Sequence, residues 1–253
     1  MRVRNRWGWG FEIAASSNPQ PHRLRTRMAP GTVPSGPMPS APAILARGPW
    51  APDAVDVHWD AEHYTPPPAV GAAADAAIAA LRDRGSPSHD GLAARLVDHE
   101  EARGRLRLRL QPVRWALRLV EGDASSSVAA TCLTRDSEGR WLAGRRAPWL
   151  ASWAGRWALG AGGAVDVGES PVDTLTRELQ EEWSVQPERL RVEALVRLPH
   201  DLVMLVGQAW LAPGAEVRRD HEHDLHAWWP ADVGAWPEEA DPALRTMARL
   251  LDA

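Results

Sequence analysis

Three glutamates lie close together in one short segment, in a pattern that can bind a divalent cation. Glu178, Glu181 and Glu182 stand at positions i, i+3 and i+4 of residues 171–183, a stretch whose sequence favours a helix. On a helix they share one face, where their charges repel, and a bound cation removes that repulsion. Oxygen ligands of this kind suit Mg²⁺, with Mn²⁺ as a substitute, rather than Zn²⁺. The segment is therefore a candidate metal site.

The neighbouring residues predict how this helix is held. Ser170 is a candidate N-cap, and Pro171 suits the first helical turn. An apolar stripe on a separate face can anchor the helix on a sheet; it consists of Val172, Leu175, Leu179 and Trp183. Upstream glycines, at 160, 162, 163 and 168, allow a loop to pass closely beside the carboxylates.

The spacing resembles the signature of the Nudix hydrolases: G, five residues, E, seven residues, then R-E-U-x-E-E-x-G-U, where U is bulky and aliphatic. The matching residues are Gly163, Glu169, Arg177, Glu178, Leu179, Glu181, Glu182 and Val185. Ser184 departs from the pattern, because the family has glycine there. A chance match has a probability on the order of 10⁻⁷ per window. The resemblance extends over roughly residues 125–253.

The resemblance implies a fold, a reaction and roles for these residues. The fold is α/β (α+β), a mixed β-sheet sandwiched between helices. The reaction is hydrolysis of a diphosphate linkage, typically in a nucleoside diphosphate joined to another group, by water that bound Mg²⁺ activates. Glu178 and Glu182 are the first metal ligands, with Glu181 next and the backbone carbonyl near Gly163 completing the shell. Glu181 also counts among the catalytic candidates.

Three further catalytic candidates follow. In the family pattern, Glu169 and Arg177 orient the site through an arginine–carboxylate pair. The general base is sought in residues 218–230, an acidic and histidine-rich segment, where Glu222 is either a base, a further Mg²⁺ ligand or a solvated loop acid. An alternative for the same segment is a zinc site at His221 and His223.

The loop before the signature holds the candidate substrate-binding residues. Trp149 and Trp153 can stack on a base, although each can equally pack in the core. Arginines that flank the loop can contact phosphates or serve at the surface; they are Arg145, Arg146 and Arg156. All 29 basic residues of the chain are arginine, so every contact from a basic side chain to phosphate falls to this residue type.

Two other functions stay open on the same fold. Isopentenyl-diphosphate isomerases resemble this signature and use an active-site cysteine, and Cys132 is the only cysteine here. Some family members bind a ligand and regulate without catalysis, but these usually lose signature glutamates, which this chain keeps.

Composition divides the chain of 253 residues into three parts. Residues 1–45 are predicted to be a disordered Arg- and Pro-rich tail, 46–122 an accessory α/β module, and 123–253 the Nudix domain. The first 40 residues carry a charge of +5, so the rest carries −9 of the total −4. A single cysteine excludes a disulfide framework, and no apolar run is long enough to span a membrane. We expect a cytoplasmic protein with a small-molecule diphosphate substrate and no nucleic-acid partner; a homodimer is left open.

Patterning predicts the main elements. Helices are expected at 71–84, 171–183 and 241–251, with a short one within 111–121. Strands are expected on both sides of an acidic turn within 91–113, and at 126–136, 140–147, 190–198 and 201–211. Leu106, Leu108 and Leu110 alternate with arginines, which predicts a half-buried strand with a solvated or anion-binding arginine row.

Overall fold

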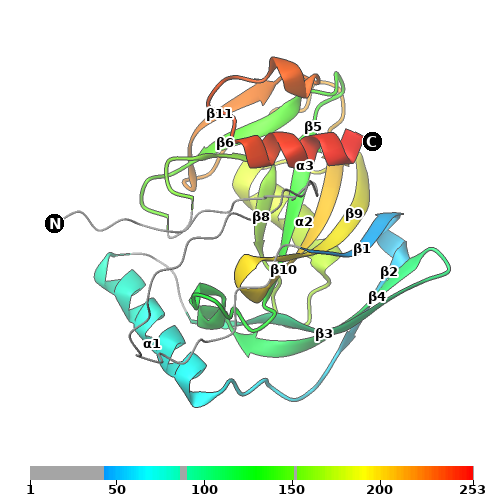
Figure 1. Ribbon diagram of the computed structural model, residues 1–253. Helices are drawn as coiled ribbons and strands as arrows, with labels where there is room; N and C mark the ends of the chain where they lie inside the picture. The colour runs from blue at the N-terminus through cyan, green and yellow to red at the C-terminus, as the bar shows by residue number, and fades with distance from the viewer. Residues whose placement is uncertain (1–42, 86–89, 151–152, 253) are drawn as a thin grey trace, which may run out of the picture.

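The computed structural model describes residues 43–85, 90–150 and 153–252, so most of the predicted tail lies outside the described residues. Within these ranges the chain forms one eight-stranded sheet, one three-stranded sheet and three α-helices (Figure 1). This is the mixed α+β architecture that the sequence predicts. No helix in the described ranges is long and apolar enough to cross a membrane.

The larger sheet is mixed, since its two central strands run parallel and their neighbours antiparallel. Its main path is β1 (Ala43–Trp50), β9 (Arg189–Leu198), β10 (Leu202–Trp210), β5 (Val128–Arg135), β6 (Trp141–Arg146) and β11 (His223–Trp229). Two short strands lie off this path: β7 (Trp157–Leu159) pairs with β6, and β8 (Ala161–Ala164) pairs with β5. The parallel pair is β10 with β5.

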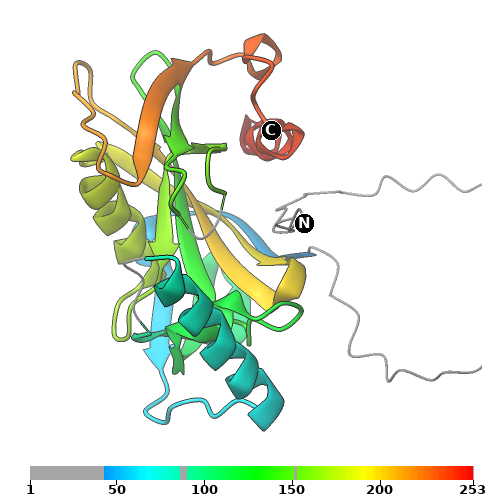
Figure 2. The same cartoon turned by 90° about the vertical axis from the view of Figure 1, so that its left-hand side faces the viewer.

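Two helices cover opposite faces of this sheet (Figure 2). Helix α2 (Pro171–Trp183) buries the predicted apolar stripe against one face, where its Leu175 and Leu179 share a core with Cys132 of β5. Helix α3 (Pro242–Asp252) packs on the other face through Leu244 and Ala248. The side-chain period of two along each strand therefore decides which helix a residue faces.

The face under α3 accounts for several of the tryptophans. Trp157, Trp229, Trp236 and Trp141 form a chain of ring contacts, with centroids 5.5, 5.0 and 5.9 Å apart between successive members. These rings lie in or against one hydrophobic cluster with α3, so they close the core.

The accessory module has its own sheet and helix. Its strands are β2 (Val55–Trp59), β4 (Arg105–Arg114) and β3 (Leu92–Ala102), in the order β2-β4-β3. Helix α1 (Pro68–Asp83) packs beside a 3₁₀ turn, η2 (Trp115–Leu119), which follows β4. Shorter 3₁₀ turns are η1 (Pro52–Ala54), η3 (Pro199–Asp201) and η4 (Val233–Ala235).

The arginine row of β4 lies on a solvated face. Leu106, Leu108 and Leu110 are buried, as the alternation predicts. The three arginines that alternate with them form partly exposed ion pairs: Arg105 with Asp56, Arg107 with Glu100 and Arg109 with Asp60. Each is balanced by a carboxylate, so the row does not require an anionic ligand.

The module is joined to the larger sheet along β3 and through β1. Ala94 donates a backbone hydrogen bond of 2.8 Å to the Val165 carbonyl, and Ala93 bridges to Asp166. The strand β1 pairs with β9. Residues 46–50, which the sequence groups with the accessory module, therefore form part of the edge strand of the larger sheet, while the predicted boundary near residue 122 stays a prediction.

The end of α2 generates the first test. Ser184 adopts a left-handed conformation, with φ 55° and ψ 36°, as its place in the signature predicts. Because glycine reaches this region without the Cβ penalty, we expect Ser184→Gly to raise the free energy of unfolding by about 0.5–1 kcal/mol in denaturant titration. The matched control is Ser170→Gly, at φ −83°, where the loss of the N-cap oxygen is expected to cost a few tenths of a kcal/mol. Equal losses in both variants would contradict the argument.

Candidate functional site

The signature helix begins at a capped end, and this end fixes the position of the glutamates. The Ser170 side chain accepts a hydrogen bond of 3.2 Å from the Val172 amide, and Pro171 occupies the first turn. Three turns on, the Trp183 indole is fully buried and donates to the Gly160 carbonyl at 2.9 Å. The helix is thus fixed at both ends beside the glycine loop.

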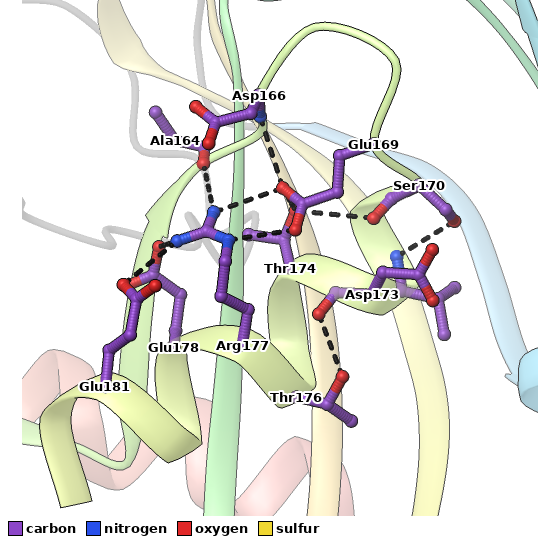
Figure 3. Close-up of polar contacts among 11 residues, drawn as sticks. Ala164, Asp166, Glu169, Ser170, Asp173, Thr174, Thr176, Arg177, Glu178 and Glu181 are labelled. Atoms are coloured by element: carbon purple, nitrogen blue, oxygen red, sulfur yellow. Dashed lines mark hydrogen bonds and ion pairs between the residues drawn. The ribbon is translucent and has the colours of Figure 1, made fainter.

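Arg177 connects the carboxylates of the signature (Figure 3). Its Nε and Nη2 donate to the two oxygens of Glu169 at 2.9 and 3.1 Å, which is the pair that the motif predicts. Its Nη1 donates to Glu178 at 2.7 Å and to Glu181 at 3.2 Å. A further bond of 3.1 Å reaches the Ala164 carbonyl, so one guanidinium joins the helix to the end of β8. Its contribution to catalysis stays a prediction.

Glu178 and Glu182 are the buried members of the group. Their side chains are 11% and 5% exposed, against 57% for Glu181. The Gly162 amide donates to Glu182 Oε1 at 3.0 Å. A Cβ at Gly163 would lie 2.1 Å from Glu178 Oε1, so any other residue at this point of β8 would displace that carboxylate.

Burial sets the electrostatics of this pair. Desolvation raises the pKa of Glu178, although the Arg177 guanidinium opposes it, and the nearby Glu181 and Glu222 charges add to the rise. Desolvation also raises the pKa of Glu182 well above its ordinary value, against the hydrogen bond from Gly162. Two neighbouring carboxylates that resist ionisation favour a cation between them.

The donor set fits a hard divalent cation by type. Carboxylate oxygens of Glu178, Glu182 and Glu181 and the backbone beside Gly163 are ligands that Mg²⁺ accepts. In the part of the chain that the structure describes, no three His, Cys, Asp or Glu side chains are already drawn together around one point. Glu178 and Glu181 instead contact Arg177, while Glu182 accepts from the Gly162 amide, and their role as metal ligands stays a prediction.

The segment before β11 forms the opposite side of the site. Backbone amides of Arg218 and Asp220 donate to the Trp183 and Glu182 carbonyls at 2.8 and 2.9 Å, so this segment lies along the end of α2. Glu222 follows, 3.5 Å from Arg146 Nη2, and its charge acts on both buried glutamates. The structure therefore brings the predicted Glu222 to the signature helix.

The two histidines of the segment lie in different surroundings. His221 is 76% exposed at its side chain and stacks on Trp149, with ring centroids 5.3 Å apart. His223 is buried, with its ring 4.5 Å from that of Trp183 and its Nε2 3.7 Å from Glu182. Burial lowers the pKa of His223 to about 4, so this ring is neutral at neutral pH. One exposed and one buried imidazole do not favour the alternative of a zinc site.

Strand alternation separates the predicted substrate-binding arginines. Arg146 faces the α2 side and the glutamates, whereas Arg145 pairs with Asp224 through two bonds of 2.8 Å. Arg156 pairs with Asp241, just before α3. Arg145 and Arg156 are thus balanced by carboxylates away from Glu178 and Glu182, and this placement favours only Arg146 for phosphate.

The two predicted stacking residues also separate. Trp153 packs against the cluster under α3, on the face away from the glutamates. Trp149 is 43% exposed, and its partner His221 directly precedes Glu222. The Ala147 amide donates to the Glu222 carbonyl at 2.7 Å, which fixes the Trp149 loop beside the site. The placement therefore favours Trp149 over Trp153 for contact with a substrate.

Sequence reasoning missed two supporting residues. Thr174 donates to Glu169 Oε2 at 2.7 Å, and the Asp166 amide donates to the same oxygen at 3.2 Å. A hydroxyl residue five positions after the glutamate and one turn into the helix was the available signal for Thr174. These bonds and those from Arg177 lower the pKa of Glu169 despite its burial.

The raised pKa of Glu182 predicts a pH-dependent effect of Glu182→Gln without metal. A carboxyl with a raised folded-state pKa stabilises the fold fully below its unfolded pKa, and loses this contribution as pH rises through the folded-state pKa. In EDTA at pH 8 we therefore expect Glu182→Gln to unfold a few degrees above wild type, which corresponds to a gain in the free energy of unfolding on the order of 1 kcal/mol. At pH 4 we expect its unfolding temperature to be close to that of wild type.

Thermal unfolding at the two pH values measures this difference. Glu138→Gln, at a side chain 71% exposed, is the control and is expected to match wild type at both. A Glu182→Gln protein less stable than wild type at pH 8 would sink the argument.

Comparison with known proteins identifies a family for the part of the chain that contains this site. The profile of the NUDIX domain matches residues 126–251. No curated protein matches the chain. Among solved structures, a MutT NUDIX hydrolase from Burkholderia pseudomallei is 25% identical, covering 49% of this chain and 97% of that one, with a TM-score of 0.41.

Two further solved structures are similar to this chain over about the same fraction of its length. A MutT protein from Methanosarcina mazei Go1 is 22% identical over 50% of this chain and 92% of its own, with a TM-score of 0.40. A C. elegans Ap4A hydrolase is 17% identical over 50% and 95%, with a TM-score of 0.39. The family profile and the signature at residues 163–185 agree, and through its domain at residues 126–251 this chain belongs to the Nudix family.

Proposed function

We propose that this protein is a Mg²⁺-dependent hydrolase that cleaves the diphosphate linkage of a nucleoside diphosphate joined to another group. The observation that carries the proposal is the buried pair Glu178 and Glu182, held beside the Gly162–Gly163 backbone and facing Glu222 and Arg146. A cytoplasmic location belongs to the same proposal and rests on the sequence alone.

The chain's own residues divide the work. Glu178, Glu182 and Glu181 would hold the ion, and the Gly162 amide keeps one oxygen of Glu182 in place. Arg177 and Glu169 fix the helix against β8 and thereby orient these carboxylates. A divalent ion held here supplies charge neutralisation for the diphosphate and a more acidic water.

Glu222 is the proposed general base, whose carboxylate would accept a proton from the attacking water. It lies across from the signature helix, and Arg146 holds its carboxylate at 3.5 Å. Arg146 is mostly buried, with 18% of its side chain exposed, so a low local dielectric strengthens its electrostatic interactions. In this arrangement Arg146 both positions Glu222 and offers a positive charge to the substrate phosphate.

The alternative of an isopentenyl-diphosphate isomerase needs a reactive thiol. Cys132 is fully buried in β5, under α2, and burial raises the pKa of its thiol to about 12. A buried thiol that stays protonated is a poor nucleophile or acid at this position. The alternative of a ligand-binding regulator lacks a specific observation, because all three helix glutamates are present.

The proposal predicts that purified protein with Mg²⁺ cleaves at least one nucleoside diphosphate derivative, such as ADP-ribose or a coenzyme A ester, in a panel that also contains isopentenyl diphosphate. Because Glu182 is a buried ligand, Glu182→Gln is expected to lower kcat/KM at least ~100-fold. Glu138→Gln serves as the surface control. Cleavage of the diphosphate linkage yields two phosphomonoesters, and chromatographic separation of the substrate from its products measures the activity of both proteins. Isomerisation of isopentenyl diphosphate without phosphate release, or equal activity of Glu182→Gln and wild type, would refute the mechanism.

A second variant tests the proton acceptor. Glu222→Gln is expected to lower kcat by about 10²-fold or more, since a general base contributes 10²–10⁴-fold. If Glu222 acts as a base, the Mg²⁺ concentration at half-maximal activity stays within about twofold of wild type; a large rise would instead make it a metal ligand. Activity within threefold of wild type at every pH would exclude both roles.

A further inference from the structure

The accessory module reaches the site through the 3₁₀ turn η2. Ala116 and Leu117 of this turn are fully buried, and Ala164 at the end of β8 packs against the same cluster. Ala164 is also the residue whose carbonyl accepts from Arg177. The turn η2 is therefore fixed beside the strand that carries Gly163, although about 50 residues separate them in sequence.

Arg118 in this turn faces the charges of the site. The two charged groups that act on its guanidinium are the Glu178 carboxylate and the Arg146 guanidinium. Burial lowers the pKa of Arg118, although an arginine keeps its charge at neutral pH. The Trp115 ring lies 5.6 Å from its guanidinium carbon. A positive charge on the accessory module is thus held within electrostatic range of Glu178, one of the proposed metal ligands.

Arg118 lacks the carboxylate partner that four other arginines of its module have. Arg105, Arg107, Arg109 and Arg114 each form an ion pair with a carboxylate. Over residues 43–85, 90–150 and 153–252, no hydrogen bond or ion pair joins the Arg118 side chain to another residue; the Trp115 ring lies beside its guanidinium. The Arg118 residue is partly buried, and a guanidinium without an anionic partner can bind a phosphate through two of its N–H groups.

We propose that Arg118 binds a phosphate group of the diphosphate substrate, so that the accessory module completes the pocket of the Nudix domain. This inference rests on the proposed function. The phosphate lies between the metal-binding glutamates and a pair of guanidiniums, Arg146 from the Nudix domain and Arg118 from the module. Their mutual repulsion, which acts on Arg118 in the structure, is relieved by the anion.

Binding of imidodiphosphate, which contains two phosphates and resists hydrolysis, tests this role without turnover. Isothermal titration in saturating Mg²⁺ compares wild type, Arg118→Gln, Arg118→Lys and the control Arg109→Gln, which lies in the same module. We expect Arg118→Gln to weaken Kd at least about 10-fold and Arg118→Lys less, because lysine keeps the charge without the planar fork. Arg109→Gln is expected to stay within twofold.

The kinetic readout separates binding from folding. With a substrate found in the panel, Arg118→Gln should raise KM at least about 10-fold while kcat stays within about threefold. If Arg118→Gln fails to fold, Arg118→Lys is compared with the control Arg109→Lys instead. We then expect Arg118→Lys to bind imidodiphosphate at least threefold more weakly than this control. If the wild type cleaves a diphosphate and the Arg118 variants keep its Kd and KM, this inference is overturned and the proposed function stands. A wild type that neither binds imidodiphosphate nor cleaves any compound would overturn both.

Discussion

The desolvation of two carboxylates is the constraint on which the rest of this structure depends. Glu178 and Glu182 lie one turn apart on α2 and are almost completely buried, so each resists ionisation beside the other. Their surroundings offset part of this cost: a backbone amide from Gly162 reaches one, and Arg177 reaches the other. The Glu178 carboxylate can lie against β8 in this way because residue 163 has no Cβ.

The same constraint explains why the helix is so firmly anchored. Leu175, Leu179 and Trp183 are fully buried on the sheet, and Arg177 links the helix to β8. A helix that carries repelling charges on one face needs this apolar stripe on another to stay in place. The packing therefore maintains an electrostatically unfavourable arrangement that a cation would relieve, which is typical of a binding site rather than of a structural helix.

Much of this could be predicted from sequence, and the misses have a physical pattern. The helix at 171–183, the strands at 190–198 and 201–211 and the alternation of β4 rest on local periodicity, which a single sequence displays. The edge strand β11 escaped detection, because its acidic and histidine-rich start reads as a loop and its pairing with β6 is a long-range contact.

The site residues follow the same division. The signature gave the carboxylates and the Glu169–Arg177 pair, since all lie within 23 residues of each other. The choice between Arg145 and Arg146 could not be made from sequence, because it depends on which face of β6 meets α2. Arg118 carried no local signal at all: its position follows from the docking of one sheet on another through Ala93 and Ala94. The charges that act on a buried group come from whatever the fold packs around it, and in this protein that includes a module outside the Nudix domain.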